Sequence, residues 1–289
     1  MKIGITGVNG FVGSRLAAIA SEGGHEVVGF SRSPSGSQRL FSSHQPPDAS
    51  GLDAIVHLAG EPILGLWTAT KKQRIRSSRV EGTRRLVEGI TLAKDKPRVL
   101  ISASAIGFYG ETGEATADES TPCGSGFLAE VAQDWETEAI AAESLGVRVV
   151  RLRIGFVIGR GGAMKLMLPA FRLGGGGKIG SGHQWMSGVH VDDVAGLALM
   201  AAGSDSLSGP VNAVLPEPVR NADFTRALAK AVRRPAVIPA PAWMLRFALG
   251  ELSHVLLDSL RVVPGVAREA GYQWRFPTLE AALREVTGT

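Results

Sequence analysis

Three glycines, spaced three residues apart, follow the first apolar run of the chain. Residues 2–6 form that run, and Gly7-Val8-Asn9-Gly10-Phe11-Val12-Gly13 leads from it into a helical pattern that extends to about residue 21. The first glycine permits a tight turn, the second lets the backbone approach a pyrophosphate, and the third allows close packing of helix on strand. The helix N-terminus adds unpaired N–H groups and positive potential. We therefore expect a dinucleotide phosphate site here, with an ordinary turn as the alternative. The expected contacts are Gly7, Gly10, Phe11, Val12 and Gly13.

Short apolar runs alternate with helical patterns along the first two thirds of the chain. Strands are expected at 26–30, 54–58, 98–102 and 147–152, and helices at 80–93, 127–144 and 191–202. Continuous apolar runs separated by helices are typical of βαβ units, whose parallel strands are buried on both faces. The sequence therefore predicts an α/β fold with a Rossmann-type, doubly wound parallel sheet.

The pattern changes at about residue 155. Glycine-rich stretches follow that point, and the C-terminal part of the chain is rich in proline. This composition predicts a smaller C-terminal substrate-binding domain that covers the carboxyl edge of the sheet. We expect residues 1–154 and 187–212 to form the Rossmann domain, and residues 155–186 and 213–289 to form the smaller one.

Composition excludes several classes of protein. Of the 289 residues, 44% are apolar and 20% are charged, which is average for a soluble globular protein and argues against disorder, collagen and coiled coil. The single cysteine, Cys123, permits no internal disulfide and no cysteine-based zinc site. No His, Asp and Glu set has metal-ligand spacing, so no metal is expected. Without a membrane-span-length apolar run or a signal-peptide pattern at the N-terminus, we expect a cytoplasmic protein.

A net charge of +4 and a pI of about 9.5 raise the question of nucleic-acid binding. The basic residues are scattered, and only residues 71–85 are dense in Lys and Arg. A solvated helix face is the simplest interpretation of that stretch, and binding of a phosphate-bearing small ligand is the main alternative. We therefore expect no nucleic-acid partner.

The end of the second predicted strand favours NADP over NAD. NAD sites usually place a carboxylate there to bind the ribose 2′-hydroxyl, whereas this chain reads Phe30-Ser31-Arg32-Ser33. Arg32 can pair with a 2′-phosphate and stack on adenine, and Ser31 can donate a hydrogen bond to the phosphate. A surface arginine without a ligand is the alternative. After the third strand, the small residues of Leu58-Ala59-Gly60 let the backbone pass beneath the adenosine and ribose.

Several further motifs are spread over almost the whole chain. They are Ser31-Arg32, Leu58-Ala59-Gly60-Glu61-Pro62-Ile63, Ser78-Arg79-Val80, Ser102-Ala103-Ser104-Ala105-Ile106-Gly107-Phe108-Tyr109-Gly110, Phe127-Leu128-Ala129-Glu130, Val189-His190-Val191-Asp192-Asp193 and Ala270-Gly271-Tyr272. Together they resemble the extended (atypical) short-chain dehydrogenase/reductase superfamily, of the NAD-dependent epimerase/dehydratase type. The finer motifs are similar to the epimerase-family subgroup that includes the mammalian member 1 of short-chain family 39U.

The resemblance implies further cofactor contacts. It implies that Arg79 helps to hold NADP(H), at a position where many extended relatives carry an Asn. It also implies a contact from Ser102, and that Gly155-Phe156-Val157 forms the loop on the nicotinamide side.

The acid–base pair of the superfamily is absent. Extended short-chain enzymes carry Tyr-x-x-x-Lys on one helix, where the lysine charge lowers the phenol pKa. Aligning Glu136 with the usual glutamate puts Leu128 and Ala132 at the Tyr and Lys positions. Ser104 matches the catalytic serine, and Tyr109 lies in the loop after the strand, where it could face the nicotinamide. The alternatives are a structural serine at the strand end and a tyrosine that packs against the substrate lobe.

Without a neighbouring lysine, the Tyr109 phenol should keep its ordinary pKa of about 10 and act as a neutral proton donor. We therefore expect an NADP(H)-binding oxidoreductase or epimerase that acts on a small carbonyl or sugar-like substrate. A catalytically silent NADP(H)-binding sensor or interaction protein is the alternative. The expected partner is a small-molecule substrate, with no nucleic acid and no membrane, and a homodimer stays open.

Overall fold

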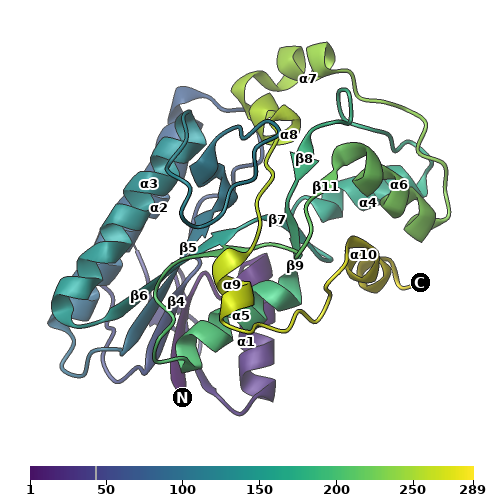
Figure 1. Cartoon of the computed structure of the whole chain (residues 1–289). Helices are drawn as coiled ribbons and strands as arrows, with labels where there is room; N and C mark the ends of the chain where they lie inside the picture. The colour runs from purple at the N-terminus through teal and green to yellow at the C-terminus, as the bar shows by residue number, and fades with distance from the viewer. Residues whose placement is uncertain (43) are drawn as a thin grey trace.

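The structure is a computed structural model that describes residues 1–42 and 44–289 (Figure 1). Its elements in chain order are β1 (Lys2–Thr6), α1 (Phe11–Glu22), β2 (Glu26–Ser31), β3 (Arg39–Leu40), β4 (Ala54–His57), α2 (Ala69–Leu92), β5 (Val99–Ala105), η1 (Ile106–Tyr109), α3 (Phe127–Ile140), η2 (Ala141–Leu145), β6 (Arg148–Ile154), β7 (Phe156–Ile158), α4 (Met164–Arg172), β8 (Trp185–Met186), β9 (Gly188–His190), α5 (Val191–Gly203), β10 (Gly209–Ala213), β11 (Val219–Arg220), α6 (Asn221–Val232), α7 (Ala242–Leu249), η3 (Gly250–Ser253), α8 (His254–Leu257), α9 (Gly265–Glu269) and α10 (Leu279–Thr287).

Within the described residues, seven parallel strands form the central sheet in the order β10-β6-β5-β4-β1-β2-β3. The chain winds in one direction from β1 to β3 and in the other from β4 to β10. The winding therefore reverses between β1 and β4, which is the position where open α/β sheets bind their ligands. The predicted doubly wound α/β fold is confirmed.

Side chains alternate along each strand and divide the core into two layers. In β4, Ala54 and Val56 pack in the layer that contains α1 and α5, whereas Ile55 packs in the layer that contains α2 and α3. Helices α1 and α5 contact each other over one face of the sheet, and α2 contacts α3 over the other (Figure 1). Because helices cover both faces, most strand residues are apolar, as the sequence predicts, and polar side chains gather in β5 and β6.

The register brings the carboxyl ends of neighbouring strands to one edge. Thr6 of β1 pairs with Phe30 of β2 and His57 of β4, and His57 pairs in turn with Ser102 of β5. The loops that leave the sheet after these residues therefore emerge side by side. The predicted cofactor contacts Gly7, Gly10, Arg32, Leu58, Ala59 and Gly60 lie in these loops, and Phe11, Val12 and Gly13 follow in the first turn of α1.

A separate hydrophobic cluster lies outside the central sheet and joins β7, α4, α6 and α10. Here β7 pairs with β9, and β8 pairs with β11. Helix α4 is missing from the sequence analysis, because the glycines on both sides of it conceal an apolar face formed by Met164, Leu168 and Phe171. The predicted domain boundaries stay a prediction.

Helix α2 is longer than the sequence indicates. It begins at Ala69 rather than residue 80, because the Thr68 hydroxyl accepts a hydrogen bond from the N–H of Lys71 and caps the first turn. The dense basic stretch at 71–85 therefore lies within this helix. None of the helices in the described part of the chain is long and apolar enough to cross a bilayer.

His57 is fully buried in β4. Its Nδ1 lies 2.6 Å from Thr6 Oγ1, and its Nε2 lies 3.0 Å from Thr83 Oγ1. Burial, with a smaller effect of the Arg79 charge, lowers the pKa of the imidazole to about 3. The unfolded chain protonates at a higher pH than the folded one, so the stability from this group is complete above pH 6.5 and is lost as the pH falls toward 3.

We expect acidification from about pH 6.5 to about pH 4 to cost about 3 kcal/mol of unfolding free energy through His57 alone. His57→Gln should flatten this pH dependence, because the amide can bond both threonines and does not titrate. Urea unfolding at several pH values measures the effect, and His183→Gln, an exposed position, is the control. The same pH slope in His57→Gln and wild type would contradict the assignment.

Candidate active site

Helix α1 begins directly after Gly10, and no side chain of the described residues caps its first turn. By contrast, the hydroxyls of Thr68 and Thr278 accept hydrogen bonds from the first turns of α2 and α10. The first N–H groups of α1 and the positive end of its dipole are therefore available to an anion.

Each glycine of this turn has a different structural role. Gly7 has a φ of +70°, a left-handed conformation that favours glycine. A Cβ on Gly13 would lie 2.2 Å from the Gly7 carbonyl oxygen, so only glycine lets α1 approach the end of β1 this closely. Gly10 has an extended backbone, and its nearest obstacle is the same carbonyl oxygen at 3.1 Å. This geometry fits the predicted pyrophosphate site, and Phe11 and Val12 follow in the first helical turn.

The end of β2 carries no carboxylate. Ser31 Oγ accepts hydrogen bonds from Asn9 Nδ2 at 3.3 Å and from the N–H of Ser33 at 3.2 Å, which ties β2 to the glycine turn. The exposed Arg32 makes no ion pair within the described residues. Glu61 lies near Arg32. The pKa of the Glu61 carboxyl is lowered mainly by Lys71, whose ammonium donates a hydrogen bond to it at 2.7 Å, and to a lesser degree by the charge of Arg32.

The loop after β4 is fixed to the end of β1. The N–H groups of Leu58 and Ala59 donate to Thr6 Oγ1 at 3.1 and 3.2 Å. The exposed Gly60 follows, and a Cβ there would lie 3.3 Å from Arg79 Cζ. The predicted contacts Leu58, Ala59, Gly60 and Arg79 are therefore neighbours.

Arg79 has a guanidinium without a carboxylate partner. Its Nη1 donates to the carbonyl oxygens of Glu61 and Ile75 at 3.0 and 3.1 Å, and no ion pair reaches it within the described chain. Burial lowers the pKa of Arg79 to about 10. Because a half-buried cation without a directly paired carboxylate is costly, this position favours an anionic ligand.

Residues 155–157 connect the sheet to the outer cluster. The N–H of Gly155 donates to the Ala213 carbonyl, and the N–H of Phe156 donates to the Ser187 carbonyl, both at 3.0 Å. A Cβ on Gly155 would lie 2.4 Å from the Ser187 oxygen, so glycine is needed for this crossing. Val157 continues into β7. The structure thus places this loop after β6, at the carboxyl edge of the sheet.

Ser104 belongs to a buried polar network under α3. Its Oγ donates to Glu136 Oε1 at 2.7 Å, and Arg153 binds both oxygens of Glu136, at 2.8 and 2.9 Å. Arg151 adds a contact at 3.2 Å. Ser102 is also buried, and its Oγ donates to the Ala103 carbonyl at 3.3 Å. In the sequence Glu136 stands out only as an alignment position, because its partners Arg151 and Arg153 lie on a different element, β6.

Tyr109 joins the same network from η1. Its hydroxyl donates to Asn212 Oδ1 at 2.7 Å and accepts from Arg153 Nη1 at 2.9 Å. Burial raises the pKa of this phenol in spite of the nearby Arg153 charge, so the expected ordinary value is wrong. The neutral form is correspondingly favoured. The hydroxyl is directed into the interior, because its proton is donated to a fully buried asparagine.

A pocket of about 390 Å³ lies between η1, the start of α3 and the segment that runs from η3 through α8. Leu128, which replaces the tyrosine of the usual pair, lines it. Trp67 and Phe127 form an edge-to-face aromatic pair in its wall, with ring centroids 5.3 Å apart. The charged or titratable groups among its lining residues are Glu111, Glu251, His254 and Asp258.

The charges around this pocket are mostly negative. His254 Nδ1 lies 2.9 Å from Asp258 Oδ1, and Lys72 pairs with Glu251 at 2.7 Å at the pocket rim. No Lys or Arg is among the described residues that line it. Within residues 1–42 and 44–289, no cluster of His, Cys, Asp and Glu could hold a metal ion.

Comparison with known proteins identifies similar chains. A family profile described as "NAD dependent epimerase/dehydratase family" matches residues 3–213, and a domain of unknown function matches residues 240–286. A chloroplastic epimerase family protein, the SDR39U1 homolog of Arabidopsis thaliana, is 35% identical over 301 residues, covering 99% of this chain and 86% of the relative.

Two solved structures are similar over the whole of this chain. Human epimerase family protein SDR39U1 (isoform 2), crystallised with NADPH, is 34% identical with a TM-score of 0.93, covering 100% of this chain and 99% of that one. A nucleoside-diphosphate sugar epimerase from Corynebacterium glutamicum is 33% identical with a TM-score of 0.84, covering 100% of this chain and 58% of that one.

The buried network predicts a large difference between two glutamates of α3. Glu136→Gln should lower the unfolding free energy by about 3 kcal/mol, because it leaves Arg153 buried without a counterion. Glu138→Gln breaks only a surface pair with Arg84 and should cost less than about 1 kcal/mol. Urea denaturation of both variants measures these costs, and equal destabilisation would show that the network does not stabilise the fold.

Proposed function

The chain belongs to the NAD dependent epimerase/dehydratase family, and on that premise we propose that it is an NADP(H)-dependent oxidoreductase of a small carbonyl substrate. The family and the NADPH in the human SDR39U1 structure support a nicotinamide cofactor. The observation that carries the preference for NADP(H) is the end of β2, where Arg32 follows Ser31 and no carboxylate is present.

Each part of the cofactor has residues that suit it. The uncapped first turn of α1 suits the pyrophosphate, and Arg32 suits a 2′-phosphate next to the adenine. Arg79 supplies a further cation behind Gly60. The residues 155–157 would then face the nicotinamide. When bound, the cofactor supplies the hydride, and the protein supplies orientation and a proton.

The pocket beside Leu128 supports a substrate without phosphate groups. A nucleoside diphosphate brings two negative charges, and the described lining contains carboxylates but no Lys or Arg to compensate them. Its aromatic and aliphatic residues instead fit an uncharged organic molecule. A small carbonyl compound is therefore favoured over a nucleoside-diphosphate sugar of the kind named for the C. glutamicum protein.

Ser104 is the proposed proton-handling group, and Tyr109 is a positioning residue of the same buried network. Ser104 stands near the carboxyl end of β5, and donation of its proton to a substrate oxygen requires the buried hydroxyl to turn away from Glu136. Tyr109 positions Arg153 of the same network. Because its raised pKa keeps the phenol neutral, the site lacks a phenolate base, which favours carbonyl reduction over alcohol oxidation.

A catalytically silent NADP(H)-binding sensor is the second candidate. One observation favours it: both hydroxyl protons, of Ser104 and Tyr109, are already donated to buried acceptors. Such a protein would bind the cofactor through the same crevice and convert no substrate.

The cofactor proposal predicts that NADPH binds at least ~10-fold more tightly than NADH, as one charge-assisted contact provides. Arg32→Ala should remove most of this preference without changing the melting temperature, because the side chain is exposed. Titration calorimetry with both cofactors measures it. Arg98→Ala, at an exposed position beside the amino ends of the strands, is the matched control. Equal dissociation constants in wild type would rule out the proposed specificity.

The reaction is tested by following NADPH oxidation with a panel of aldehydes, quinones and nucleotide sugars. We expect slow reduction of an uncharged carbonyl and none of the nucleotide sugars. Ser104→Ala and Tyr109→Phe should each lower the rate about 10²-fold while NADPH affinity is unchanged. Ser144→Ala, at an exposed position, should have no effect. NADPH binding without turnover of any compound would favour the sensor, and turnover of nucleotide sugars alone would contradict the assigned substrate class.

A further inference from the structure

Two segments of the C-terminal half contain basic residues and no acidic ones. Residues 160–191 and 224–250 together carry nine Lys and Arg and no Asp or Glu, whereas the rest of the chain carries 22 Lys and Arg against 27 Asp and Glu. The positive net charge of the protein is therefore confined to these segments. In the sequence they are separated by more than thirty residues, so the concentration of charge emerges only in the fold.

The fold joins the two segments edge to edge. Gly175 forms a β-bridge with Ala236, the N–H of Ile238 donates to the Gly176 carbonyl at 3.1 Å, and the N–H of Ala240 donates to the Lys178 carbonyl at 2.9 Å. Helix α4 of the first segment also contacts α6 of the second. The chain then continues into α7, which lies at an outer end of the molecule (Figure 1).

Large apolar side chains are exposed along this joined edge. Helix α7 buries none of its residues. Five of the large apolar residues on this edge are Leu173 at 87%, Val237 at 74%, Ile238 at 59%, Trp243 at 72% and Phe247 at 91% exposed. The same two segments carry exposed cations: Arg172, Lys178, Arg233, Arg234 and Arg246. We call these ten residues the basic–apolar face.

We propose that the basic–apolar face docks on the surface of a membrane that contains anionic phospholipids. Its five cations make no ion pair within the described residues, so their charge is available to lipid phosphates. Basic residues near an anionic leaflet attract it, while exposed Trp, Phe and aliphatic side chains enter the boundary between headgroups and acyl chains. Both requirements are met on one edge of the molecule.

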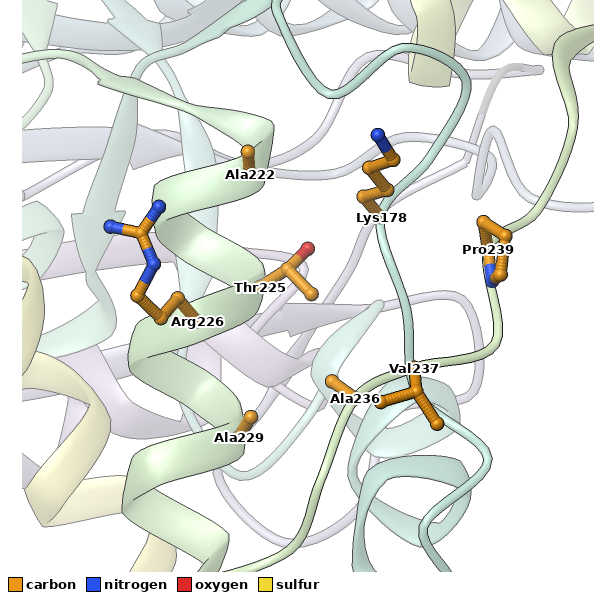
Figure 2. A pocket seen from close by; sticks show the side chains of 8 residues that line it. All are labelled: Lys178, Ala222, Thr225, Arg226, Ala229, Ala236, Val237 and Pro239. Atoms are coloured by element: carbon orange, nitrogen blue, oxygen red, sulfur yellow. The ribbon is translucent and has the colours of Figure 1, made fainter.

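A hollow of about 370 Å³ opens on this face between α6 and residues 236–239. Figure 2 shows Lys178 and Thr225 on its facing walls, while the Arg226 side chain points away on the other side of α6. Small apolar groups complete the lining: Ala222, Ala229, Ala236, Val237 and Pro239. An ammonium at the edge of an apolar hollow suits the phosphate and glycerol part of an anionic lipid.

Other occupants fit this face less well. A symmetric dimer would bring the same patch of two copies together, and without carboxylates the cations would repel one another. Nucleic acid would satisfy the cations, but it offers no partner for Leu173, Val237 and Ile238. The sequence-based expectation of no membrane partner rested on the lack of a spanning segment, and surface docking needs no such segment.

The test is co-sedimentation of the whole protein with phosphatidylglycerol vesicles and, in parallel, phosphatidylcholine vesicles at low salt. We expect binding to the first only, and a shift of tryptophan emission to shorter wavelength that Trp243→Phe abolishes. Lys178→Gln with Arg234→Gln should weaken partitioning about 25-fold, at about fivefold for each basic residue. Trp243→Ala with Phe247→Ala should abolish it. These exposed substitutions should leave the melting temperature unchanged.

Leu92, Lys94 and Lys96 provide a matched control, because they are exposed at the far, amino-terminal end of the strands. The triple variant Leu92→Ala, Lys94→Gln, Lys96→Gln should bind like wild type. Failure to pellet with phosphatidylglycerol, or equal loss in the control, would overturn the proposal. The proposal would also be overturned if the substitutions on the basic–apolar face left vesicle binding intact but abolished dimer formation or the binding of duplex DNA.

Discussion

The close approach of α1 to the end of β1 is the contact on which the proposed cofactor site depends. With 2.2 Å between the site of a Gly13 Cβ and the Gly7 oxygen, no other residue is compatible with this turn. The contact places the uncapped start of α1 beside the point where the sheet reverses its winding, between β1 and β4. Thr6 then holds the next loop against the same point through two backbone N–H groups. The position of the uncapped N–H groups of α1 at the carboxyl edge of the sheet is thus a consequence of packing.

The interior under α3 shows what replaces the usual acid–base pair. Leu128 and Ala132 stand on this helix in place of a phenol and an ammonium, and the buried charge of the helix is Glu136, balanced by Arg151 and Arg153. The two candidate hydroxyls bond to this network rather than to each other. A lysine would lower a phenol pKa, whereas burial here raises it. Both candidate hydroxyls are therefore hydrogen-bonded donors within a buried network, without an ammonium on α3 beside them.

The sequence predicts those features that depend on local pattern. The glycine turn, the buried strands and the α/β fold follow from spacing and apolar runs, and the motifs identify the family. Long-range pairing leaves no such pattern. Asn212 and Tyr109 meet across a separation of 103 residues, and the pocket wall combines Trp67 with His254. The start of α2 was missed because a single threonine cap, rather than apolar periodicity, sets it. The concentration of basic residues on one face likewise depends on the pairing of two segments, 160–191 and 224–250, that are distant in the sequence.

The central claim is that the turn between β1 and α1 binds the cofactor phosphates, and calorimetric titration with NADPH tests it directly. Gly10 has an extended backbone, and a Cβ there would meet only the Gly7 carbonyl oxygen, at 3.1 Å, so Gly10→Val should fold after a small shift of that carbonyl while its side chain occupies the space of the pyrophosphate. Gly203→Val, where a Cβ meets nothing within 4 Å, is the control. The account predicts binding by wild type and Gly203→Val, and none by Gly10→Val at an unchanged melting temperature. Wild-type affinity in Gly10→Val would contradict it.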